Sequence, residues 1–229
     1  IKMQRKDLAD KSIDGYENTK EEALELYDAP LDELRESASK ITSHFFKEAI
    51  ELCCISNGKC GKCSENCKFC SQSRYYNTEI QQSVLKSVDE FFKEAQANDK
   101  RGVHRFSIVT AGVRLSKAEL KTIAQAYKKI SSELKISCCG SLGLLDYDDF
   151  VMLKESGLKR YHDNLETSPN FFKEICTTHT MKQKEDTIAL AKKAGLEICS
   201  GCILGMGESV EDRVDIALAQ RVIKYRGKE

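Results

Sequence analysis

The stretch "ELCCISNGKCGKCSENCKFCSQS", residues 51–73, joins a short apolar run to a loop that is dense in cysteine. The loop holds four of the eleven cysteines of the chain, at positions 60, 63, 67 and 70. Together the four give CxxC, CxxxC and CxxC, and the last three alone give CxxxCxxC. Three kinds of structure need thiols this close together, namely a disulfide knot, a zinc site and an iron–sulfur cluster.

Composition argues against the disulfide knot. The chain has 229 residues, 31% of them charged, whereas secreted disulfide scaffolds are shorter and contain about 8–10% cysteine. Lys+Arg and Asp+Glu are equal at 36 each, without the basic excess of a nucleic-acid binder. No apolar run approaches the roughly 18 residues of a membrane span, and no signal-peptide pattern opens the chain. We therefore expect a cytoplasmic protein without nucleic-acid or membrane partners, whose clustered thiols bind metal or do redox chemistry.

The spacing favours an iron–sulfur cluster over zinc. Zinc sites usually combine two CxxC pairs that lie a dozen or more residues apart, and this loop has no distant CxxC or HxxxH partner. Simple burial does not fit either, because the Gly, Lys, Ser, Glu and Asn between the cysteines are typical of an exposed loop. Three thiolates on a four-iron cluster leave one iron open, as catalytic metal sites require. The spacing therefore favours an iron–sulfur cluster, and the three-cysteine motif of Cys63, Cys67 and Cys70 is the form of it that would leave one iron open on a [4Fe–4S] cluster.

The rest of the chain alternates between strand-like and helix-like segments, which indicates βα units and a parallel sheet, hence an α/β fold. Residues 1–48 predict a helical extension, in which Thr19 is an N-cap and Pro30 separates two helices. Residues 49–229 then form the βα domain. The expected strands lie within 51–56, 104–110, 134–142, 158–166 and 196–205, and the expected helices are 85–97, 116–132, 146–156, 181–194 and 209–223.

Five βα units are fewer than a closed barrel needs. An eight-unit barrel takes about 250 residues, and this chain begins with Ile1 and runs into "QRVIKYRGKE" at 220–229 without a sixth strand pattern. We therefore expect a barrel that is incomplete at its C-terminus, as part of a longer protein or as a truncated product.

Several stretches carry a resemblance to a known family. CxxxCxxC after a first strand, with Phe69 before the last cysteine, resembles the radical S-adenosylmethionine (SAM) superfamily. Over roughly residues 8–218 the chain resembles biotin synthases, which implies a TIM-barrel-type (β/α) fold. The matching stretches are "CSENCKFCSQS" (63–73) with Tyr75 and Tyr76, "YHDNLETS" (161–168), "TTHT" (177–180) and "AKKAGLEICSGCILGMGES" (191–209).

The resemblance implies a radical SAM sulfur insertion that converts dethiobiotin to biotin, the last step of biotin biosynthesis. The implied cofactors are a [4Fe–4S] cluster, SAM and an auxiliary iron–sulfur cluster, [2Fe–2S] or a variant of it, that donates the sulfur. The implied partners are dethiobiotin and an electron donor such as flavodoxin or ferredoxin, and a homodimer is a candidate assembly.

The resemblance also assigns roles to residues outside the cysteine loop. Glu166, Lys184 and Gly205 correspond to SAM-binding positions, and Asn164 corresponds to a dethiobiotin contact. Asn164 and Glu166 are two apart in an expected strand, so we expect both to face the barrel interior. Lys184 lies near the place of an arginine in the family, and it keeps the positive charge without the bidentate fork. We expect His162 and His179 to be hydrogen-bonding scaffold.

The ligands of the auxiliary cluster are only partly assigned. The resemblance places Cys139 and Cys199 at ligand positions, while the second-strand position near "VTAGV" (109–113) has no cysteine. Cys60 and Cys202 are further candidate ligands. Adjacent strand residues face opposite ways, and we expect Cys53 and Cys139 to face inward. The remaining thiols, Cys54, Cys138 and Cys176, are expected to be small core side chains.

Two other functions stay open at this point. One is another small-molecule radical SAM enzyme, of the hydrogenase-maturase kind, which the cysteines of strands three and five would distinguish. The other is a truncated, inactive iron–sulfur-binding fragment, which a continuation of the barrel in the full-length gene would exclude.

Overall fold

The structure, a computed structural model, describes residues 5–47 and 49–223. Three helices precede the sheet, α1 (Arg5–Ile13), α2 (Lys20–Tyr27) and α3 (Leu31–Phe46). The predicted cap of α2 is confirmed, because the Thr19 side chain accepts a hydrogen bond from the Glu22 amide and the Glu22 carboxylate accepts one from the Thr19 amide. Pro30 stands immediately before α3, so the predicted break between the two helices is also confirmed.

The alternation of strands and helices is confirmed as well. Within the part of the chain that the structure describes, five parallel strands form one sheet in the order β1-β2-β3-β4-β5. The four-residue helix α7 (Phe172–Ile175) was not predicted. The strands are β1 (Cys53–Lys59), β2 (Arg105–Thr110), β3 (Ser137–Ser141), β4 (Leu158–His162) and β5 (Glu197–Cys199), and the helices are α4 (Val88–Asp99), α5 (Lys117–Glu133), α6 (Tyr147–Glu155), α8 (Met181–Lys193) and α9 (Val210–Ile223).

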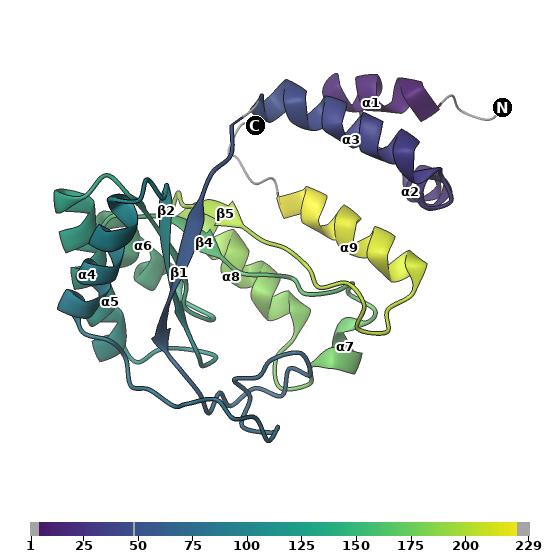
Figure 1. The fold of residues 1–229 in the computed structure, drawn as a ribbon. Helices are drawn as coiled ribbons and strands as arrows, with labels where there is room; N and C mark the ends of the chain where they lie inside the picture. Colours follow the sequence, from purple (N-terminus) through teal and green to yellow (C-terminus); the bar gives the residue numbers. More distant parts are fainter. Residues whose placement is uncertain (1–4, 48, 224–229) are drawn as a thin grey trace.

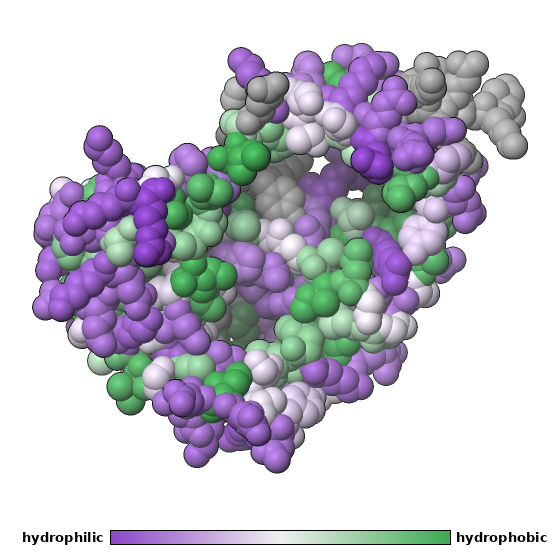
Figure 2. Space-filling model, in the orientation of Figure 1, coloured by the Kyte–Doolittle hydropathy of each residue, from purple (hydrophilic) through white to green (hydrophobic). Residues whose placement is uncertain are grey.

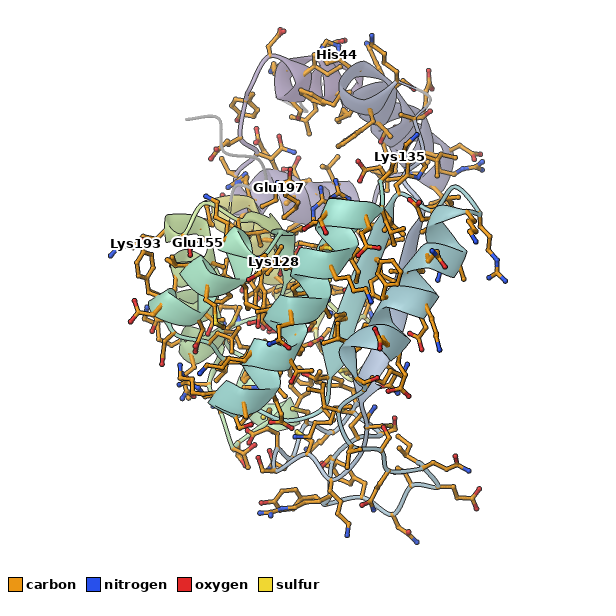
Figure 3. All side chains as sticks on the ribbon, turned by 90° about the vertical axis from the view of Figure 1, so that its left-hand side faces the viewer. His44, Lys128, Lys135, Glu155, Lys193 and Glu197 are labelled. Carbon is orange, nitrogen blue, oxygen red and sulfur yellow. The ribbon has the colours of Figure 1, made fainter. Side chains whose placement is uncertain are left out.

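Helices α4, α5, α6 and α8 cover one face of the sheet and bury the core there (Figures 1 and 3). The Tyr127 hydroxyl of α5 donates a hydrogen bond of 2.8 Å to the carbonyl oxygen of Cys139, which ties the helix layer to β3. Each large apolar side chain buried here contributes roughly 1.5–3 kcal/mol. The core includes Phe91, Phe106, Ile108, Tyr127, Phe150 and Tyr161, all at most 1% exposed.

The other face of the sheet is open and curved. Arg105 on β2 reaches Glu197 on β5 at 3.7 Å, and Arg160 on β4 reaches Glu51, just before β1, at 3.6 Å. Strands that are not neighbours can exchange such contacts only if the sheet curls as a barrel wall does. Ile55 of β1 is 71% exposed on this face, and Figure 2 shows a hollow there that is bordered by apolar side chains.

The N-terminal helices and the cysteine loop lie at opposite ends of the strands (Figure 1). Glu197, labelled in Figure 3, marks the end of the sheet that faces the N-terminal helices. Lys20 of α2 pairs with Asp215 of α9 at 2.7 Å, and Arg213 of α9 donates to the Tyr27 hydroxyl at 2.8 Å. The helical extension therefore packs on α9, and a domain division at residue 48 stays a prediction. None of the described helices is long and apolar enough to cross a membrane.

Candidate cluster and cofactor site

The cysteine loop leaves β1 and passes along the carboxyl ends of the strands (Figure 1). The Cys63 amide donates to the Gln72 carbonyl at 2.9 Å, and the Arg74 amide donates to the Cys63 carbonyl at 3.0 Å. These bonds close the loop, and Cys63, Cys67 and Cys70 all line one cavity. The loop therefore presents the thiols of the CxxxCxxC motif to a common space, at the strand ends where parallel α/β folds bind their ligands.

A second set of hydrogen bonds ties the loop to the segment after α7. The Asn66 side-chain oxygen accepts from the Thr177 amide at 2.9 Å, and its amide nitrogen donates to the Thr177 hydroxyl at 2.6 Å. The Lys68 amide donates to the Ile175 carbonyl at 2.9 Å. The position of the thiols is thus fixed by a segment that lies more than a hundred residues away in the sequence.

One wall of the cavity needs glycine. Gly143 follows β3 with φ +82°, and a Cβ atom there would lie 2.4 Å from the Val113 carbonyl oxygen. Only glycine accepts this backbone and this close approach. The wall is otherwise largely apolar and includes Val109, Val113, Leu144, Phe69 and Phe172.

The opposite side of the cavity is charged. Lys184 of α8 lies 2.5 Å from Asp163 Oδ1, and both side chains are 11% exposed. Burial raises the pKa of Asp163 and of Glu166 above their ordinary values, although Lys184 acts in the opposite direction on both. Among the described residues, Asp163 Oδ2, Glu166 Oε2 and Thr110 Oγ1 are buried without a hydrogen-bond partner, and all three residues line the cavity. These oxygens can accept hydrogen bonds from a polar ligand.

The strand argument for Asn164 and Glu166 is wrong. β4 ends at His162, and Glu166 has φ +69°, outside any strand conformation. Glu166 lines the cavity, but Asn164 is not among the described lining residues, and its Oδ1 lies beside Gly201. A non-glycine residue held in the left-handed region stores strain, which is commonly found at functional sites. The other expected cofactor residue, Gly205, also lies outside the described lining, and its amide donates to Glu208 at 2.7 Å.

The donor set of the cavity fits an iron–sulfur cluster and an amino-acid-like cofactor. Thiolates are the ordinary ligands of iron–sulfur clusters. Burial raises the pKa of the Cys67 and Cys70 thiols in the absence of metal, so cluster binding has to release their protons. The carboxylates and the ammonium group nearby suit a ligand that carries both charges and hydroxyl groups.

A second group of thiols lies on the open face of the sheet. In the strand register, Ile55 pairs with Ser107, and Ser107 pairs with Cys139. Cys139 pairs with Arg160, and His162 pairs with Cys199. Along the strand direction, Cys53 therefore lies two residues before the position that is level with Cys139, and Cys199 lies two residues beyond it.

This diagonal is what a barrel layer requires. In an eight-stranded barrel of shear 8, residues at one height advance by about one residue per strand, and each layer comes from alternate strands. Cys53, Cys139 and Cys199 come from β1, β3 and β5 and advance by two residues per two strands. Arg105 on β2 lies two residues before the position that is level with Glu197 on β5, which is the same direction of offset. Their contact at 3.7 Å therefore agrees with this direction of tilt. The three thiols thus share one layer.

The pKa shifts of Cys53 and Cys139 agree with this shared face. Burial raises the pKa of Cys139 to about 11, and the charges of Cys53 and Cys199 also raise it. Burial likewise raises the pKa of Cys53, with a contribution from Cys199. Arg160 acts in the opposite direction on both, and it is itself paired with Glu51 and Glu197.

The structure separates the other two candidate ligands from this layer. Cys60 lies five residues past Ile55, about 16 Å further along the strand direction at ~3.3 Å per residue. Its sulfur contacts Asn57 and Gln72 instead. Cys202 is exposed and bridges to Glu166.

Of the three cysteines expected in the core, Cys138 is 1% exposed and belongs to the core cluster, and Cys54 packs against it. Cys176 is buried as well, but it also lines the cavity, and its sulfur lies 3.7 Å from that of Cys67. The description of Cys176 as a simple core side chain is therefore incomplete. His179 Nδ1 donates to Glu65 Oε2 at 2.8 Å, in agreement with its expected scaffold role. None of the described hydrogen bonds of His162 involves its side chain.

Sequence reasoning missed Asp163 and the group formed by Cys176, His179 and Glu65. Asp163 carried no distinct local signal, because it stands among other polar residues in "YHDNLE" (161–166), and its partner Lys184 lies on another element. The histidine three residues after Cys176 was the sole hint of a polar environment for that thiol.

Comparison with known proteins agrees with this geometry. A family model of the radical SAM superfamily matches residues 59–219, which is more than half of the chain. The fold and the cysteine loop are therefore those of a radical SAM protein. The chain is 42% identical over 219 residues to a biotin synthase of Clostridium perfringens, covering 96% of this chain and 69% of that protein. A biotin synthase of Clostridium botulinum is 46% identical over 211 residues, covering 92% and 66%. The chain belongs to the biotin synthase family, and it spans about two thirds of the length of these relatives.

Solved structures show the same fold at much lower identity. Methylornithine synthase (PylB) superposes with a TM-score of 0.80 at 19% identity, covering 95% of this chain and 65% of that one. The hydrogenase maturase HydG superposes with a TM-score of 0.79 at 18% identity, covering 96% and 52%. The expected TIM-barrel-type radical SAM fold is thereby confirmed.

Proposed function

We propose that this chain carries the radical SAM centre of a biotin synthase, which inserts sulfur into dethiobiotin to form biotin. The observation that carries the proposal is the convergence of Cys63, Cys67 and Cys70 on the cavity that also holds Glu166 and Lys184. Identities of 42–46% to biotin synthases support this substrate over that of a hydrogenase maturase, because the likeness to HydG, at 18% identity, concerns the fold alone.

Different residues of the cavity would bind the cluster and the different parts of SAM. The cluster, when bound, supplies the electron that cleaves SAM to a carbon radical able to take hydrogen from dethiobiotin. Cys63, Cys67 and Cys70 would hold the cluster. Lys184 would bind the SAM carboxylate, and the unpartnered Asp163 Oδ2 would accept from its ammonium group. Glu166, by its unpartnered Oε2, would accept from the ribose hydroxyls.

The apolar wall serves a different purpose. Val109, Val113, Leu144 and Phe172 leave little to hold water in this part of the cavity. A radical on carbon is consumed by side reactions unless its surroundings exclude solvent and other hydrogen donors. Asn164, which lies beside the cavity near Gly201, is kept as a proposed dethiobiotin contact.

For the auxiliary cluster we propose Cys53, Cys139 and Cys199 as the thiol ligands. Cys53 on β1 compensates for the cysteine that is missing from the second strand, where Ser107 stands beside Cys139 in the register. Cys60 and Cys202 are thereby less favoured ligands. The electron donor, the homodimer and the cytoplasmic location stay predictions.

The test of the first cluster is anaerobic reconstitution with iron and sulfide, read by iron content and by the change of the spectrum when SAM is added. The wild type should show a SAM-responsive [4Fe–4S] spectrum. Cys63→Ala, Cys67→Ala and Cys70→Ala should each abolish it, and Cys60→Ala is the matched control that keeps it. A SAM-responsive spectrum in any of the three ligand variants would overturn the assignment.

The auxiliary site is tested in a protein that already carries the three Ala replacements in the loop, so that all remaining iron reports on the second site. Cys53→Ser, Cys139→Ala and Cys199→Ala should each lower this iron content, whereas Cys202→Ala should not. Full iron content in Cys53→Ser would remove Cys53 from the ligand set. Product analysis with dethiobiotin in the full-length protein tests the substrate.

A further inference from the structure

Cys176 places a second thiol directly against a proposed cluster ligand. Its sulfur lies 3.7 Å from Cys67 Sγ, and a protonated Cys67 donates to it. Once Cys67 is a thiolate ligand it has no proton left to donate, so in that state Cys176 has to be the donor. Cys176 is 4% exposed, so water does not compete for its S–H group. None of the roles proposed above uses this thiol.

The other neighbours of Cys176 are poor acceptors for its proton. His179 Nδ1 lies 3.3 Å from the Cys176 sulfur, but the same nitrogen lies 2.8 Å from Glu65 Oε2. A carboxylate oxygen only accepts, so Nδ1 carries the hydrogen that is donated to Glu65. A protonated Nδ1 cannot also accept from the Cys176 thiol. Nε2, which is then the acceptor nitrogen of the neutral ring, lies farther from the sulfur, at 3.8 Å.

The Thr178 hydroxyl, 3.6 Å from the Cys176 sulfur, is also engaged. It donates to Asn66 Oδ1 at 3.2 Å and accepts from the Asn66 amide at 3.0 Å. The acceptor that gains most from the Cys176 proton is therefore the sulfur of Cys67, above all when it carries the negative charge of a thiolate ligand.

Backbone bonds hold the two sulfurs at this separation. The Lys68 amide, next to Cys67, donates to the Ile175 carbonyl, next to Cys176, at 2.9 Å. Asn66 binds the amides of Thr177 and Thr178 at 2.9 and 3.3 Å. The chain on both sides of each cysteine is thus fixed to the other segment, and the S–H···S contact is a built feature of the fold.

We propose that Cys176 is a positioning residue that donates an S–H···S hydrogen bond to Cys67 and so raises the reduction potential of the cluster. Hydrogen bonds to the sulfur ligands stabilise the more negative, reduced cluster, and they are one of the features that set the potential. The inference rests on the proposed function, because it takes Cys67 as a cluster ligand.

The experiment is a redox titration of the reconstituted protein, in which the reduced cluster is followed by electron paramagnetic resonance without SAM or substrate. Cys176→Ala should lower the midpoint potential. A roughly tenfold change in the one-electron reduction equilibrium corresponds to about 59 mV. Cys176→Ser retains a donor and should restore most of the difference. Cys138→Ala, a buried cysteine on the core face of β3, is the matched control and should leave the potential unchanged.

The outcomes separate this inference from the proposed function. A wild-type protein that assembles no SAM-responsive cluster would overturn the proposed function. A normal cluster with equal potentials in the wild type, Cys176→Ala and Cys176→Ser would overturn the inference alone. Loss of iron from both variants would also overturn it, since Cys176 would then be a ligand or a packing requirement rather than a hydrogen-bond donor.

Discussion

Lys184 Nζ lies 2.5 Å from Asp163 Oδ1, and the two side chains form a buried ion pair that joins α8 to the segment after β4. Only one Asp163 oxygen is engaged, because Oδ2 has no hydrogen-bond partner among the described residues. The pair therefore compensates the buried Asp163 charge and keeps one acceptor oxygen for a ligand.

Removal of the cation should be costly for folding. Lys184→Met leaves the Asp163 carboxylate buried and unpaired, and breaking a buried pair in this way costs about 3–5 kcal/mol. The matched control on the same helix is Lys182→Met, whose pair with Asp186 is 73% and 57% exposed and should contribute nothing measurable. Urea unfolding of the cluster-free protein measures both. Equal losses would show that the Asp163–Lys184 pair is not buried in solution.

Glu166 should make stability depend on pH. Burial raises its pKa in the folded protein, so the folded state holds the Glu166 proton more tightly than the unfolded state does. Wild-type stability should then fall as the pH rises from the ordinary glutamate range through the raised pKa. Glu166→Gln carries no such charge and should be more stable than the wild type at pH 7.5, with the difference vanishing near pH 4. Thermal unfolding across this range is the measurement, and a constant difference would contradict the prediction.

Gly143 lies in the cavity wall, and Gly102 serves as its control because both have a left-handed backbone. Both have positive φ, +82° and +76°, but a Cβ at Gly102 meets nothing within 4 Å, whereas one at Gly143 meets the Val113 carbonyl at 2.4 Å. Gly102→Ala should cost about 1–2 kcal/mol for the left-handed backbone alone. Gly143→Ala should cost clearly more and should also weaken SAM binding. Similar unfolding midpoints would mean that the wall relaxes freely around the new methyl group.

The thiols should differ in reactivity before any metal is bound. Burial raises the pKa of Cys139 to about 11 and that of Cys138 to about 12, so at pH 8 roughly one Cys139 thiol in a thousand is ionised. Cys53 and Cys202 are exposed and should react with iodoacetamide before Cys138 and Cys139 do. Peptide mapping by mass spectrometry gives the order, and early modification of Cys138 would contradict the burial of the core face.

Local sequence patterns were sufficient for most of the fold. The alternation of apolar runs and amphipathic stretches predicted every strand and all the longer helices, because periodicity reports burial directly. It overestimated β4 and β5, since the expected strands ran to residues 166 and 205, whereas β4 ends at His162 and β5 at Cys199. The positive φ of Glu166 is invisible in the sequence, because nothing in a glutamate signals the left-handed region.

The sites were predictable where the ligands are close in sequence. Cys63, Cys67 and Cys70 were assigned from their spacing together with the resemblance to the radical SAM superfamily, and all three line the cavity. Strand parity was enough to predict an inward-facing Cys53, but its level with Cys139 and Cys199 depends on the strand register and tilt. The contact of Cys176 with Cys67, 109 positions apart, and the Asp163–Lys184 pair exist only after the segments have been brought together by tertiary packing.

The Asn66 bonds to Thr177 and Thr178 have one more consequence. Small metal sites commonly fold only when their metal arrives, so that part of the binding free energy is consumed in ordering the chain. Here the loop acquires its shape from ordinary amide and hydroxyl hydrogen bonds as the domain folds. The cluster would then bind to a loop that is already folded, and its loss should leave the conformation of the loop unchanged.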